Sequence, residues 1–118
     1  MQQFSFTHVE NELISKFRKK INEAESTEDV KKSFVYCMQE LFRKVSDGAL
    51  EVRPDEISLK PDEASFFIGE NIRSRTEFAR VWNNSDLPRI VGRFAELALN
   101  QYKHLAKNPA KTEAKIRM

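Results

Sequence analysis

The sequence predicts a mainly α-helical protein of the α+β class: a helical hairpin, a small β-hairpin insertion and two further helices packed around one core. Three observations predict this fold. Apolar residues recur at helical spacing in three long stretches of the chain. Glycine and proline number only three and four in 118 residues, too few for the many turns of a β-sandwich. Nine phenylalanines supply the bulk of a core, which a chain of this length can bury without disulfides.

The first helix is expected at about residues 8–24. Thr7 and Glu10 are spaced as a capping box, in which a hydroxyl and a carboxylate satisfy the first backbone amides of a helix. The charged side of this helix carries acids and lysines four residues apart, as in Glu12 and Lys16, so we expect them to pair within the helix. Its apolar stripe consists of Leu13, Ile14, Phe17, Ile21 and Ala24.

The second helix is expected at about residues 28–46, with Ser26 or Thr27 as its cap and Gly48 as its stop. The short link to the first helix favours an antiparallel hairpin. Tyr36 falls on the polar side, among charged residues. The apolar stripe is broad and consists of Val30, Phe34, Val35, Met38, Leu41, Phe42 and Val45.

Residues 49–68 have a different pattern from the two helical stretches before them, because apolar and polar residues alternate. The run RPDEISL is echoed by KPDEASF, and each copy places Pro-Asp where a type I turn favours them. We expect a β-hairpin that pairs residues 49–53 with 56–60, with residues 65–68 as a candidate third strand. The alternative is that Pro61 opens a helix.

Two helices are expected to follow, at about residues 75–83 and 87–106. The run SRTE that begins at Ser74 is a second capping box, and Ser85 or Asp86 can cap the longer helix. The shorter helix turns Phe78, Val81 and Trp82 inward. The apolar stripe of the longer helix consists of Leu87, Ile90, Val91, Phe94, Ala95, Ala98, Tyr102 and Leu105.

We therefore expect one domain over residues 1–107 and a basic C-terminal tail at 108–118. The N-terminal stretch does not have the pattern of a secretory signal, and the apolar runs are too short to span a bilayer. The single cysteine, Cys37, cannot form an internal disulfide. These features are typical of a soluble cytoplasmic protein.

The sequence lacks the motifs that carry common chemistry. It has no Gly-rich phosphate loop, no paired cysteines, no zinc-binding histidine motif and no nucleophile elbow of a serine hydrolase. Cys37 could act as a nucleophile with His8 or His104, but a buried cysteine and two surface histidines are far more common. We therefore expect no enzyme activity, no cofactor and no metal site.

Charge is segregated along the chain. Residues 41–70 carry four basic and seven acidic residues, whereas residues 71–118 carry ten basic and four acidic ones. The candidate acidic docking face consists of Asp55, Glu56, Asp62 and Glu63. The candidate contacts for a partner or a phosphate are Arg73, Arg75, Arg80, Arg89, Arg93, Lys103 and Lys107.

Two functions fit these features. The first is a non-catalytic interaction or adaptor domain that self-associates or binds a protein partner, since an acidic middle and a basic end allow charged docking. The alternative is nucleic-acid binding through a basic strip on the C-terminal helices and tail. That strip requires the basic residues to converge, and Glu96 can neutralise Arg93 or Lys103 within it. Neither a membrane nor a small-molecule substrate is indicated.

Overall fold

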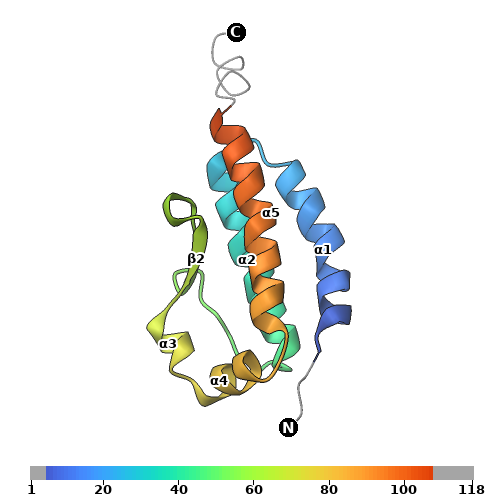
Figure 1. The fold of residues 1–118 in the computed structure, drawn as a ribbon, viewed down its shortest axis with the longest axis vertical. Coiled ribbons are helices and arrows are strands. Elements are labelled where there is room, and N and C mark those ends of the chain that lie inside the picture. Colours follow the sequence, from blue (N-terminus) through green and yellow to red (C-terminus); the bar gives the residue numbers. More distant parts are fainter. Residues whose placement is uncertain (1–4, 108–118) are drawn as a thin grey trace.

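Three long helices form the body of the molecule, and a β-hairpin with two short helices covers one side of it (Figure 1). The long helices are α1 (Thr7–Asn22), α2 (Thr27–Val45) and α5 (Leu87–Lys107). The computed structural model describes residues 5–107, so the predicted tail at 108–118 lies outside the described residues. The mainly helical α+β fold and the helical hairpin of α1 and α2 are confirmed.

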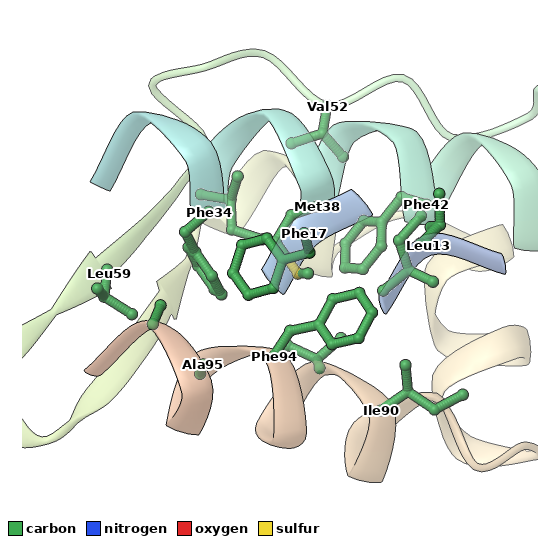
Figure 2. Close-up of a cluster of buried hydrophobic side chains, with 14 of the residues drawn as sticks. Leu13, Phe17, Phe34, Met38, Phe42, Val52, Leu59, Ile90, Phe94 and Ala95 are labelled. Atoms are coloured by element: carbon green, nitrogen blue, oxygen red, sulfur yellow. The ribbon is translucent and has the colours of Figure 1, made fainter. Parts of the chain in front are cut away.

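The core lies where α1, α2 and α5 meet, and α2 is its central element. Helix α2 contacts α1, α5 and the first strand of the hairpin. Phe34 and Phe42 of α2 and Phe94 of α5 have no exposed surface. The rings of Phe17 and Phe94 stack with centroids 5.2 Å apart, which joins α1 to α5 beneath α2 (Figure 2). Apolar residues at helical spacing thus define the interior, as predicted.

Helix α2 begins and ends as predicted. The hydroxyl of Ser26 accepts a hydrogen bond from the backbone N–H of Asp29 at 3.2 Å. At the other end, the N–H of Gly48 donates to the carbonyl of Arg43 at 2.8 Å, and Asp47 adopts the left-handed conformation with φ of 59°. This is the geometry of a Schellman motif.

The two predicted capping boxes are wrong. The N-cap of α1 is Phe6, and Glu10 is buried facing α5 instead of reaching back to the helix start. Helix α4 (Thr76–Asn83) begins after Arg75 without a side-chain cap, and the carboxylate of Glu77 pairs with Arg80. In both cases the local spacing predicts that the carboxylate accepts a backbone N–H at the start of the helix. The carboxylate instead forms an ion pair with an arginine side chain.

The predicted pairing of Glu12 with Lys16 is also wrong, because each residue pairs across the helical hairpin. Glu12 bonds to Lys44 at 3.4 Å and Lys16 to Glu40 at 3.9 Å, both on α2. Because α2 lies antiparallel beside α1, it brings residues of opposite charge as close to Glu12 and Lys16 as the next turn of α1 does. These pairs are solvent-exposed and contribute little stability.

The β-hairpin pairs β1 (Ile57–Lys60) with β2 (Ser65–Ile68), with Ile57 opposite Ile68. The predicted pairing of residues 49–53 with 56–60 is therefore wrong, whereas the third candidate, 65–68, is a strand. Leu50 and Val52 are nevertheless buried. The carbonyl of Val52 accepts a hydrogen bond from the side chain of Gln39 on α2 at 2.7 Å. Alternation at 49–53 thus reflects one buried side of an irregular segment.

The two copies of the Pro-Asp repeat adopt different conformations. In the first, the N–H of Glu56 donates to the carbonyl of Arg53 at 2.9 Å, which closes the predicted turn. In the second, Pro61 opens a single 3₁₀ turn, η1 (Pro61–Glu63), that ends at Ala64 in the left-handed conformation. The helical alternative for Pro61 therefore holds for one turn. A further short helix, α3 (Glu70–Arg73), was not predicted.

We expect Phe94→Ala to lower the free energy of unfolding by about 3–5 kcal/mol, because it removes a fully buried ring and leaves a cavity. Phe67→Ala is the matched control: its side chain is 45% exposed, so the same change should cost less than about 1 kcal/mol. Denaturant unfolding followed by circular dichroism measures both values. Equal losses in the two variants would contradict the assignment of Phe94 to the core.

Candidate functional site

Arg89 and Arg93, the central pair of the predicted basic strip, both bind one buried carboxylate. Arg93 Nη1 lies 2.7 Å from Glu10 Oε2, and Arg89 Nη2 lies 3.3 Å from Glu10 Oε1. The Glu10 side chain is 2% exposed, whereas the side chains of Arg89 and Arg93 are 56% and 41% exposed, respectively. A buried carboxylate is stable only when it is paired, so both arginines have a structural task that ties α5 to α1.

Asp86 extends this network to the start of α1. Its carboxylate accepts hydrogen bonds from the N–H of Phe6 at 2.9 Å, the hydroxyl of Ser5 at 3.3 Å and Arg89 Nη2 at 3.4 Å. Partial burial acts to raise the pKa of Asp86, but these bonds to the ionised form outweigh it and hold the pKa below its ordinary value. Asp86 therefore caps α1 from a distant part of the chain.

The other basic candidates lie at two separate ends of the molecule. Arg80 pairs with Glu77 on its own helix, and Arg73 and Arg75 are exposed in the α3–α4 region. Lys103 and Lys107 are exposed near the end of α5, a helix about 30 Å long by its residue count. Figure 1 places α3 and α4 beside the start of α5, at the opposite end from those lysines. The described part of the chain therefore does not gather the seven residues into one strip.

The acidic candidates form two turns on either side of β1. Asp55 is exposed in the turn before β1, and the carboxylate of Glu56 accepts the N–H of Arg53 at 3.0 Å in that same turn. Asp62 and Glu63 are exposed in η1, after β1. A four-residue strand separates the two turns, a distance of about 13 Å.

A groove of about 650 Å³ runs between α1 and α2 on their outer side. Its apolar lining residues are Leu13, Phe17, Ala24 and Cys37, and the first three are at most 6% exposed. Tyr36, a groove residue that is 64% exposed, confirms the predicted outward tyrosine. The charged residues of the groove are Lys16, Lys19, Lys20, Lys32, Glu23, Asp29 and Glu40. Sequence reasoning singled out Tyr36 but not the groove, which exists only once the two helices pack.

The thiol of Cys37 lies in this groove and is protonated at neutral pH. Burial, and secondarily the charge of Glu40, raises its pKa to about 12. His8 and His104 are both exposed, and neither lines the groove. Among residues 5–107, no group of three His, Cys, Asp or Glu side chains is placed to hold a metal ion. None of the helices within that range is long and apolar enough to cross a membrane.

A second hollow, of about 470 Å³, lies between β2, α3 and α4. Its aromatic lining residues are Phe66, Phe78 and Trp82, of which Phe78 is only 6% exposed, and the rings of Phe78 and Trp82 stack with centroids 5.1 Å apart. Arg73 is the only charged residue among those that line it. The sequence marked Arg73 as a candidate, but it could not place Arg73 beside an aromatic pocket built from three elements.

Comparison with known proteins found no matching family model, no similar curated protein and no similar solved structure. The function must therefore be inferred from the two hollows and from the distribution of paired and unpaired charge.

We expect Asp86→Asn to destabilise the protein by about 1 kcal/mol at neutral pH, because the substitution removes a cap and a charge partner of Arg89. The folded-state pKa of Asp86 is lowered, so its contribution is present above the unfolded-state pKa of about 4 and is lost as pH falls through the folded-state value. The difference between wild type and variant should therefore vanish near pH ~2.

Unfolding free energies measured from neutral to acid pH test this expectation. Asp62→Asn is the matched control, because Asp62 is exposed and its variant should follow wild type throughout. A difference between wild type and Asp86→Asn that persists unchanged in acid would contradict the role assigned to the Asp86 carboxylate.

Proposed function

We propose that this chain is a small, soluble, cytoplasmic, non-catalytic adaptor domain whose protein partner binds in the groove between α1 and α2. One observation carries the proposal. Tyr36 is 64% exposed beside a groove whose lining also includes the largely buried side chains of Leu13, Phe17 and Ala24. Tyrosine is enriched at the centres of protein interfaces, because it supplies apolar area together with a polar tip.

The shape and charge of the groove fit a helical segment of a partner. Two roughly parallel ridges, α1 and α2, flank an apolar channel, which is how amphipathic helices are bound in other proteins. The channel also has four lysines and three carboxylates along it. Mixed charges of this kind fix the orientation of a bound segment more than they add affinity.

The groove is better suited to binding than to catalysis. Its thiol, Cys37, is protonated at neutral pH because burial raises the pKa to about 12. A protonated thiol is a poor nucleophile, and the groove has no histidine to remove the proton. These features support the non-catalytic assignment.

We expect purified protein to form a dimer or to co-purify with one partner at fixed stoichiometry, as measured by light scattering. Tyr36→Ala should weaken the complex at least about fivefold, because truncating a central interface tyrosine costs more than about 1 kcal/mol. Ser33→Trp should weaken it by filling the groove, which Ser33 lines. Both variants should keep the helical circular dichroism of wild type.

Phe67→Ala is the matched control, because among residues 5–107 Phe67 is the other exposed large apolar side chain, and it lies on the hairpin, away from the groove. It should leave the complex intact. A strictly monomeric protein without a stoichiometric partner would overturn the proposal, as would a complex that Tyr36→Ala and Ser33→Trp leave unchanged.

Nucleic-acid binding is the weaker proposal, because Arg89 and Arg93 already share a buried carboxylate and Arg80 pairs with Glu77. Reversing the charge of Arg89 or Arg93 is a poor test, since it would place a second negative charge beside Glu10 and disturb the fold. The exposed Lys103 and Lys107 are better positions.

We expect no retention of mixed-sequence DNA or RNA at ~50 mM salt, where charge-driven binding is strongest. A gel-shift or filter-binding measurement provides the test. Retention that is abolished by Lys103→Glu with Lys107→Glu would favour the nucleic-acid function over the adaptor function.

A further inference from the structure

We propose that the pocket between β2, α3 and α4 binds a small aromatic carboxylate. This site is separate from the groove between α1 and α2, shares no lining residue with it and does not depend on the adaptor function. Its lining residues come from one continuous stretch of the chain and are Phe66, Ile68, Arg73, Phe78, Ala79, Trp82 and Asn83.

The aromatic surface of the pocket selects for a planar ring. Phe78 and Trp82 lie on successive turns of α4 and stack at an interplanar angle of 19°. Trp82 and Phe66 are only half-buried, so part of their ring surface remains accessible inside the hollow. A ligand ring can stack on this accessible surface, an arrangement that adds to the gain from burial alone. A volume of about 470 Å³ is within the range of small-ligand pockets and suits one or two rings.

Arg73 selects for a negative charge. It is exposed, and its side chain has no hydrogen bond or ion pair with the described residues of the chain, whereas Arg80, Arg89 and Arg93 are each paired with a carboxylate. The planar guanidinium can hold a carboxylate through two parallel hydrogen bonds. Asn83 adds an amide, which can donate to the same group.

The charge balance of the pocket favours a monoanion over other ligands. Arg73 is its single charged lining residue, so an amine would be repelled. A phosphate dianion would lack a second cation in the lining, because the nearby Arg80 is held by Glu77 on the same helix. A carboxylate on a short arm from an aromatic ring matches one guanidinium beside one aromatic surface.

Trp82 is the only tryptophan of the chain, so intrinsic fluorescence reports directly on this pocket. We expect 3-phenylpropionate, added to the full-length protein, to change the Trp82 emission in a saturable way, with half-saturation at roughly 0.1–1 mM for a ligand of this size. The uncharged 3-phenylpropanamide should bind at least about tenfold more weakly, because it cannot form the charged pair with Arg73.

Two variants separate the pocket from general effects of charge. Arg73→Gln should reduce the affinity for 3-phenylpropionate at least about tenfold and leave the affinity for the amide unchanged. Arg75→Gln is the matched control, because Arg75 is an exposed arginine two positions away that does not line the pocket, and it should bind like wild type. Circular dichroism checks that both variants are folded.

Four outcomes would overturn the proposal. The first is the lack of any saturable change in Trp82 emission, and the second is equal affinity for the acid and the amide. The third is tighter binding of a short peptide with a C-terminal phenylalanine than of 3-phenylpropionate, which would assign the pocket to the carboxyl end of a protein chain. The fourth is a change in emission with 3-phenylpropionate that Arg73→Gln leaves intact, which would remove Arg73 from the site.

Discussion

The structure depends on the central position of α2, whose apolar stripe packs on α1, α5 and β1 together. Phe34, Met38 and Phe42 have no exposed surface, and the ring of Phe42 lies 6.1 Å from that of Phe78 on α4. With those sides occupied, the remaining side of α2 is the one that carries Tyr36 and borders α1 along the groove. The packing that stabilises the fold therefore also decides which side of α2 stays open to solvent.

The long helices were predictable because helical periodicity depends only on residues three and four apart. Helix α5, for example, was expected at about 87–106 and is found at Leu87–Lys107. Strand pairing was not predictable in the same way, because it depends on which distant segment lies alongside. Leu50 and Val52 alternate as strand residues do, yet the backbone of Val52 bonds to α2. Alternation of apolar and polar residues indicates that one side of a segment is buried. It does not indicate which other segment forms hydrogen bonds with its backbone.

The candidate site was only partly predictable, because long-range partners compete with local motifs. Helical projection correctly placed Arg89 and Arg93 side by side on α5. Their shared partner, Glu10, is 79 and 83 residues away and has the spacing of a capping residue. Burial decides between the two roles, because a carboxylate that loses water needs the stronger compensation that guanidinium groups provide. Burial of this kind follows from tertiary packing, which local spacing does not specify.

The arginines also differ in whether their side chains form ion pairs within the protein. Arg89 and Arg93 hold α1 to α5 through Glu10, and Arg80 is matched within α4. A new anion would have to share these guanidinium groups with the carboxylates that they already hold. The guanidinium of Arg73 has no ion pair with the described residues, so this group can bind an anion without being shared with an existing partner. It lies beside the hollow that the aromatic side chains of α4 and β2 leave open.

Both hollows contain small residues at positions where a larger side chain would fill the space: Ala24, Ser33 and Cys37 in the groove, and Ala79 in the aromatic pocket. Protein interiors are otherwise closely packed, and filling an apolar hollow is a common route to higher stability. The exposed Tyr36 beside the first hollow and the guanidinium of Arg73, unpaired among the described residues, beside the second are the features on which the two binding proposals rest.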